Sequence, residues 1–100
     1  MKKITLTING KEQTLTEGSV VEVTAHDFYR NNILGKHADL KIKYIGYVRG
    51  IELWKEYYGA KKKTEHLVLA KNLNPDLGVR SSRMSDMIPF IHIISIKELK

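Results

Sequence analysis

The sequence predicts a β-rich α+β fold, in which five or six mostly antiparallel strands are combined with one or two short helices. Several segments alternate apolar and polar residues with the period of a strand, turn residues separate them, and only two segments repeat apolar residues with a helical period. The chain has 100 residues and shows no internal repeat and no linker rich in Pro, Gly or Ser. We therefore expect residues 1–100 to form a single compact domain.

The first predicted element is a β-hairpin. Apolar side chains at positions 4, 6 and 8 alternate with threonines, as in a strand with one buried face. Asn9 and Gly10 follow, and both tolerate the positive φ that a type I′ turn requires. Residues 11–16 then return as the second strand.

Residues 19–33 support two interpretations. As a strand, the segment places three apolar side chains on one face: Val21, Val23 and Ala25. As a helix, it begins with a capping box, in which Ser19 accepts a backbone hydrogen bond and Glu22 reaches back. We favour a mixture, a strand to about residue 24 followed by a helical turn or loop through residue 32.

Residues 39–49 alternate as a long strand with two different faces. The apolar face carries Leu40, Ile42, Tyr44 and Val48. The other face, interrupted only by Ile45, carries Lys41, Lys43, Tyr47 and Arg49.

Residues 51–58 fit a short helix that ends at Gly59. The apolar arc of this helix contains Ile51, Leu53, Trp54, Tyr57 and Tyr58. The competing interpretation is a second strand of a meander, because Trp and Tyr favour strands. We expect Trp54 to be largely buried and to hold the segment against the sheet.

The last third of the chain contains two further predicted strands. Residues 65–71 are apolar enough for one, and residues 72–87 are mostly loop. Residues 90–96 are apolar on both faces except at His92 and Ser95, which predicts a central strand with Ile94 in the core. The elements together fit a small SH3-like or OB-like barrel, or an open sheet with a helix.

The positive charge is unevenly distributed along the chain. The formal net charge is +6 and the sequence pI is about 9.6. Residues 36–63 hold eight Lys or Arg against three Asp or Glu, whereas residues 1–35 hold four of each. A basic stretch of this kind suits nucleic acid or an acidic protein surface as partner.

The candidate nucleic-acid interface lies within this stretch. A strand face that offers cations for phosphates and a ring for stacking is typical of single-strand binders. Its predicted residues are Lys41, Lys43, Tyr47 and Arg49, with Lys61, Lys62 and Lys63 in the following loop. The structural alternative is a solvated strand face, because lysines also protect edge strands from aggregation.

A secondary anion site is predicted at Arg80 and Arg83. The two serines between them add hydroxyl donors, and paired guanidinium groups bind phosphate or carboxylate well. In the alternative interpretation these arginines pair with Asp76 and Asp86 in a surface loop.

Motifs for catalysis, metals and cofactors are not found in the sequence. There is no cysteine and no phosphate-binding glycine loop. The four histidines, which show no metal-ligand spacing, are His26, His37, His66 and His92. We expect His92, among isoleucines, to be a core residue, and we predict no metal, no cofactor and no enzymatic activity.

These observations favour a small basic binding module. Nucleic-acid binding is the leading hypothesis, and a protein–protein interaction domain, such as a phage or mobile-element inhibitor of a host protein, is the alternative. A small nuclease toxin is a weaker third. We expect a cytoplasmic protein without a membrane partner, because neither a signal peptide nor a membrane span is visible. Abundant Lys and Ile with little Ala suggest a bacterial or phage source.

Overall fold

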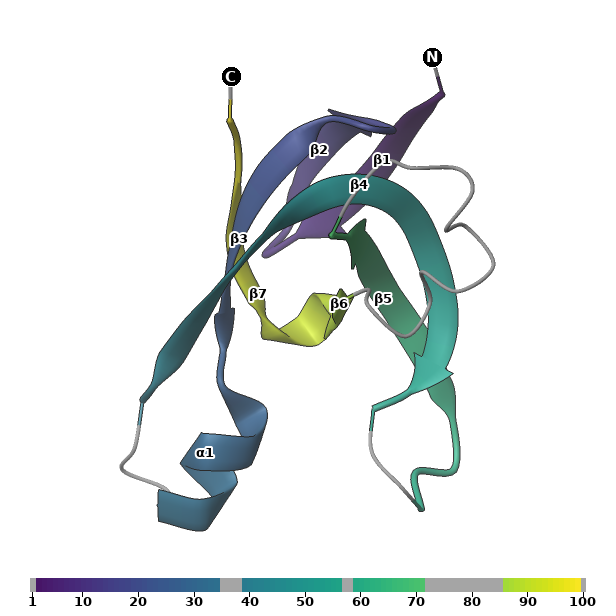
Figure 1. Cartoon of the computed structure of the whole chain (residues 1–100). Helices are drawn as coiled ribbons and strands as arrows, with labels where there is room; N and C mark the ends of the chain where they lie inside the picture. Colours follow the sequence, from purple (N-terminus) through teal and green to yellow (C-terminus); the bar gives the residue numbers. More distant parts are fainter. Residues whose placement is uncertain (1, 35–38, 57–58, 72–85, 100) are drawn as a thin grey trace.

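Two antiparallel sheets, one of two strands and one of five, form the fold (Figure 1). The computed structural model describes residues 2–34, 39–56, 59–71 and 86–99. Within these residues the protein is strand-rich with little helix, and the strands do not close into a complete barrel. The strand-rich, antiparallel part of the predicted fold class is therefore confirmed, with seven strands among the described residues in place of five or six.

The predicted hairpin is present as β1 (Lys3–Ile8) and β2 (Lys11–Thr16). Asn9 and Gly10 both have positive φ, 53° and 79°, as a type I′ turn requires. The alternating residues of β1 are buried, and with Leu15 they cover the core side of the larger sheet. Local sequence was sufficient for this prediction because a two-residue turn fixes the register of a hairpin.

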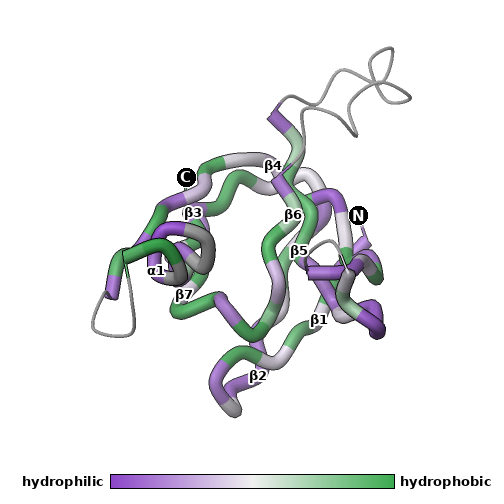
Figure 2. Tube along the Cα trace, turned by 90° about the horizontal axis from the view of Figure 1, so that it is seen from below, coloured by the Kyte–Doolittle hydropathy of each residue, from purple (hydrophilic) through white to green (hydrophobic). Residues whose placement is uncertain are grey.

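The five-stranded sheet has the order β6-β5-β4-β3-β7. Its strands are β3 (Val20–His26), β4 (Lys41–Lys55), β5 (Lys63–Ala70), β6 (Asp86–Pro89) and β7 (Ile93–Glu98). A 3₁₀ turn, η3 (Phe90–His92), joins β6 to β7. Seen from below, these strands trace a ring with α1 (Phe28–Leu34) at one side (Figure 2).

The core lies between the hairpin and the inner face of the five-stranded sheet. Its fully buried side chains include Leu15, Val21, Val23, Val48, Leu67, Leu69, Ile88 and Ile93. Two side chains of the hairpin tie it to β7: Asn9 Nδ2 donates to the carbonyl of Ile94 at 3.2 Å, and Gln13 Nε2 donates to the carbonyl of Ile96 at 3.1 Å. These bonds partly satisfy the edge of β7 that lacks a strand neighbour in the described part of the chain.

Residues 51–55 are not helical. They continue β4, which bends over the molecule and pairs with β5 from Tyr47 to Lys55 (Figure 1). The strand alternative is correct in type, but the segment continues β4 and does not form a second strand. Pairing with β5 satisfies the backbone of a segment whose aromatic and β-branched residues already favour strands. Trp54 is 45% exposed, so the prediction of its burial is wrong. Tyr57 and Tyr58 lie outside the described residues.

The segment that follows the hairpin agrees with the mixed interpretation, because β3 leads directly into α1. The predicted capping box is wrong, since Ser19 donates its hydroxyl to the carbonyl of Thr16 at 2.6 Å. Asp27 caps the helix instead, and its Oδ1 accepts from the backbone N–H of Arg30 at 3.1 Å.

The C-terminal predictions need three corrections. Residues 86 and 87 belong to β6 and not to the predicted loop. The other residues of that predicted loop, 72–85, lie outside the described residues. The 90–96 segment begins as η3, and within the described residues β7 pairs only with β3, so it is an edge strand of the described sheet. The irregular register between β3 and β7 turns Ile93 into the core, 2% exposed, while Ile94 is half-buried.

Candidate functional site

The four predicted strand residues lie together on the outer face of β4. Their side chains alternate with inward-facing residues, and Lys41, Lys43 and Arg49 are exposed while Tyr47 is half-buried. We call Lys41, Lys43, Tyr47 and Arg49 the β4 basic face. Ile45, 54% exposed, lies between the two lysines and the tyrosine on the same face.

Acidic side chains reduce the local charge of this face. Lys41 Nζ lies 3.2 Å from Asp39 Oδ2, and Lys43 Nζ lies 3.5 Å from Glu22 Oε1 on β3. Exposed ion pairs of this kind stabilise a protein by only about 0–1 kcal/mol. A phosphate that approaches either lysine therefore competes with a weak internal partner.

The loop lysines do not extend the β4 basic face. Lys63 is the first residue of β5 and lies opposite Lys55, whereas Lys41 lies opposite His26 at the other end of β4. At about 3.3 Å per residue, these two ends are about 46 Å apart along the strand. Figure 1 shows them on opposite sides of the arch that β4 makes.

The predicted interface is thus divided into two basic clusters. The second, which we call the β4–β5 lysines, consists of Lys55, Lys61, Lys62 and Lys63, all exposed. Arg80 and Arg83 lie outside the described residues. Asp86, one of their proposed partners, accepts a hydrogen bond from Lys71 Nζ at 2.8 Å.

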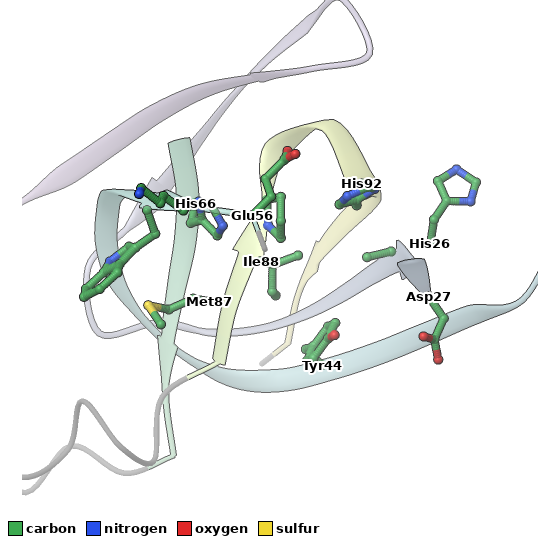
Figure 3. Close-up of a pocket in the computed structure, with 12 residues that line it drawn as sticks. His26, Asp27, Tyr44, Glu56, His66, Met87, Ile88 and His92 are labelled. Carbon is green, nitrogen blue, oxygen red and sulfur yellow. The ribbon is translucent and has the colours of Figure 1, made fainter. Parts of the chain in front are cut away.

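The structure also contains a pocket that sequence reasoning missed. Its volume is about 270 Å³, and it lies between the C-terminal ends of β3 and β4, the start of β5, β6 and η3. Three of the four histidines line it, together with Glu56, Tyr44 and Trp54 (Figure 3). The signal was missed because these residues are up to 66 positions apart, from His26 to His92, and only the curvature of the sheet and the pairing of β7 with β3 bring them together.

The pocket histidines differ in environment. His66 is buried, and its Nδ1 lies 2.8 Å from the carbonyl oxygen of Thr64. A carbonyl only accepts, so the Nδ1 that faces it carries a hydrogen. Burial lowers the pKa of His92 below its ordinary 6.5, against the opposing effect of the Glu56 carboxylate. His92 is half-buried at this pocket, so its predicted place in the core is wrong.

Two acidic residues line the pocket in different states. Asp27 is engaged as the cap of α1 and lies 3.7 Å from an Arg30 guanidinium nitrogen. Glu56 Oε1 is buried and has no hydrogen-bond partner among the described residues. A buried carboxylate oxygen without a donor costs about 1–3 kcal/mol or more, and this oxygen has almost no surface that a ligand in the pocket could reach.

The rim of the pocket is apolar and aromatic. Trp54 and Met87 both line the pocket, and both are more than two-fifths exposed. The indole N–H of Trp54 donates to Glu52 Oε1 at 3.0 Å, which restricts the orientation of the ring. An exposed aromatic ring beside a cavity is suited to stacking on a planar ligand.

Two further results bound the site. The described part of the chain contains no group of three or more His, Asp or Glu side chains arranged to hold a metal ion. None of its helices is long and apolar enough to span a membrane. Comparison of the chain with known protein families, with curated proteins and with solved structures found no match.

Proposed function

We propose that this chain is a small binding module for single-stranded nucleic acid and that it is not an enzyme. The observation that supports the proposal is the β4 basic face, where three exposed cations flank the half-buried ring of Tyr47. Cations hold the phosphates of such a strand, and an aromatic ring stacks on a base whatever its sequence.

The shape of the sheet suits an extended ligand. Lys41 and Arg49 are eight residues apart on one strand, or about 26 Å. Ile45 adds apolar area between the cations. We infer further that the sheet is a partly open SH3-like barrel, which is supported by the β3-to-β6 meander, the pairing of β7 with β3, and the η3 turn between β6 and β7.

The test measures oligonucleotide binding by fluorescence anisotropy at several salt concentrations, with thymine-only DNA as the probe. The variant is Lys41→Gln, Lys43→Gln and Arg49→Gln together. A matched control, Lys2→Gln, Lys3→Gln and Lys11→Gln, removes the same charge from exposed positions in the β1–β2 hairpin and next to it. Each lost phosphate contact lowers the salt slope by about 0.7 for single strands, so the first variant should lose about two units of slope.

The control should retain most of the binding and of the slope. Equal losses in the two triple variants would show that only net charge matters, and would contradict a defined interface. If the wild-type protein bound no oligonucleotide at about 50 mM salt, where phosphate binding is strong, the proposal would be refuted.

A protein-binding module is the second candidate, and the exposure of Trp54 and Met87 favours it. Large apolar side chains on one rim are typical of interaction surfaces. A complex that buries them should persist at salt concentrations that abolish oligonucleotide binding, because the hydrophobic contribution is not screened by ions.

A further inference from the structure

The pocket between β3, β4 and η3 gathers three of the four histidines of the chain, and the β4 basic face does not explain it. His26 is the last residue of β3, His66 belongs to β5, and His92 is the last residue of η3. Histidine changes its charge between about pH 5 and 8, so the charge of this pocket depends on the pH in that range. The β4 basic face, as defined above, contains no histidine.

The other charged groups at the pocket cancel one another. Lys55 lines it with a positive charge and Glu56 with a negative charge, and Tyr44 adds a phenol. Asp27 also lines it, but its Oδ2 lies 3.7 Å from an Arg30 guanidinium nitrogen. The formal charges of these two cations and two anions sum to zero. Protonation of the histidines therefore makes the described part of the pocket positive.

The environment of His92 links its proton to the charge around it. Burial is the largest of the causes that act on the pKa of His92 and lowers it. The Glu56 carboxylate opposes this effect, and the charges of His26 and His66 lower the pKa further. An anion in the pocket would act in the same direction as the Glu56 carboxylate and favour the protonated ring. Binding of an anion and binding of protons therefore strengthen each other.

The other two histidines are oriented by contacts with their own surroundings. His26 Nδ1 lies 3.6 Å from Asp39 Oδ1, and Asp39 Oδ2 in turn lies 3.2 Å from Lys41 Nζ. His66 Nδ1 faces the carbonyl oxygen of Thr64. Figure 3 shows His66 and His92 on either side of the Glu56 side chain in projection, with His26 farther out. The three rings thus approach the pocket from separate elements, and each adds a positive charge when it is protonated.

A phosphomonoester suits the charge and the size of this pocket. It carries about −1.5 to −2 charges at pH 7, more than a carboxylate, and gains correspondingly more from protonated imidazoles. A phosphomonoester is a terminal group and can enter a pocket, whereas a phosphodiester continues into the chain on both sides. The volume of about 270 Å³ is just below the range of about 300–1,000 Å³ that drug-sized ligands occupy, so it exceeds what one phosphate needs. The exposed rings and apolar groups of Trp54 and Met87 can contact the organic part of the ligand.

We propose that this pocket binds a phosphomonoester group and takes up protons on its histidines as it does so, so that its affinity rises as the pH falls below about 7. Lys55, exposed and part of the lining, supplies a positive charge at every pH in this range. The group reaches the protein on a single nucleotide or as the 5′-phosphate of a bound strand. Only the second source rests on the proposed function.

The experiment is a calorimetric titration of the wild-type protein with thymidine 5′-monophosphate and with thymidine, at about pH 6 and about pH 8. Thymidine 5′-monophosphate should bind about tenfold or more tightly at the lower pH, since a shift of one pKa unit corresponds to a factor of ten. Thymidine, which lacks the phosphate, should show no such gain. Sulfate is a third probe, because it keeps its charge in this range while a phosphomonoester gains a proton near pH 6. Titrations of sulfate in buffers of different ionisation enthalpy should show a net uptake of protons.

Two variants separate the histidines from the constant charge. His26→Gln combined with His92→Gln should bind thymidine 5′-monophosphate as the wild type does at about pH 8 and lose most of the gain at about pH 6. Lys55→Gln should weaken binding by a similar factor at both pH values. Lys11→Gln, at an exposed position of β2 that does not line the pocket, is the matched control and should change neither affinity. Thermal unfolding followed by circular dichroism establishes that each variant is folded.

Equal affinity at the two pH values for both thymidine 5′-monophosphate and sulfate, or no binding of either at millimolar concentration, would overturn the proposal. Thymine-only DNA with and without a 5′-phosphate then identifies the source of the group. A gain from the 5′-phosphate at low pH shows that the end of a strand occupies the pocket, and no gain shows that a single nucleotide is the ligand. DNA without the phosphate tests the β4 basic face alone. Nucleotide binding at low pH in a protein that binds no oligonucleotide would support the pocket and refute the strand-binding function.

Discussion

Gly46 lies in β4 beside the end of β5, and its replacement by alanine tests the packing of the sheet. A Cβ at this position would lie 2.8 Å from the carbonyl oxygen of Ala70 and 3.1 Å from Leu69 Cβ. The first of these atoms belongs to the backbone of β5, so no side-chain rotation relieves the contact. The two strands would have to separate next to the Tyr47–Ala70 pair.

The expected magnitude follows from two opposing effects. At a site without a clash, Gly→Ala stabilises a protein by about 0.4–1 kcal/mol, because the unfolded chain loses freedom. Overpacking of a well-packed region costs about 1–3 kcal/mol. We therefore expect a net destabilisation of about 1–2 kcal/mol for Gly46→Ala.

The assay is urea unfolding followed by circular dichroism, with the midpoint and slope compared between variant and wild type. Ser95→Ala, at an exposed position of β7, serves as the strand control and should change stability by no more than about 0.5 kcal/mol. An unchanged or increased stability of Gly46→Ala would show that β4 and β5 are not in close contact here.

Three further predictions test the core, the pocket and the absence of catalysis. Ile93→Ala should lower the free energy of unfolding in urea by about 2–5 kcal/mol and Ile94→Ala by clearly less, because of these two residues only Ile93 is fully buried. A larger loss for Ile94→Ala than for Ile93→Ala would show that Ile94 is the core residue. The pKa of His92 is lowered in the folded protein, so the unfolded chain binds more protons, and stability should fall as the pH decreases below the ordinary value of 6.5. His92→Gln should reduce this pH dependence, and a variant with the same pH profile as the wild type would contradict the role of His92. Single-stranded RNA should remain intact after incubation with the protein; cleavage that is lost in Glu56→Gln would show that the pocket is catalytic.

Features with local causes were predicted well. The β1–β2 hairpin follows from Asn9-Gly10 and the flanking alternation, because turn type and register are set within a few residues. The two faces of β4 from Lys41 to Arg49 follow from the period of a strand, which holds whatever the strand pairs with.

Features that depend on contacts between distant parts of the chain were not predicted well. Residues 51–55 carry both a helical arc and strand-forming residues, and the presence of β5 as a hydrogen-bonding partner decides between them. The loop lysines looked contiguous with Lys41 and Lys43 in sequence, yet the length of β4 places them at its opposite end. Ile93 replaces Ile94 in the core because η3 and the irregular β3–β7 pairing shift the alternation.

By itself, the sequence determined a basic, strand-rich chain with one hairpin and one long strand whose outer face carries cations and a tyrosine. Each of these properties depends on the charge of a segment or on periodicity over a few residues. Only the tertiary structure decided that Glu56, Trp54 and the histidines of three separate elements line one pocket. No local pattern records that arrangement, because it arises when the sheet curves and β7 pairs with β3, bringing the ends of distant strands together.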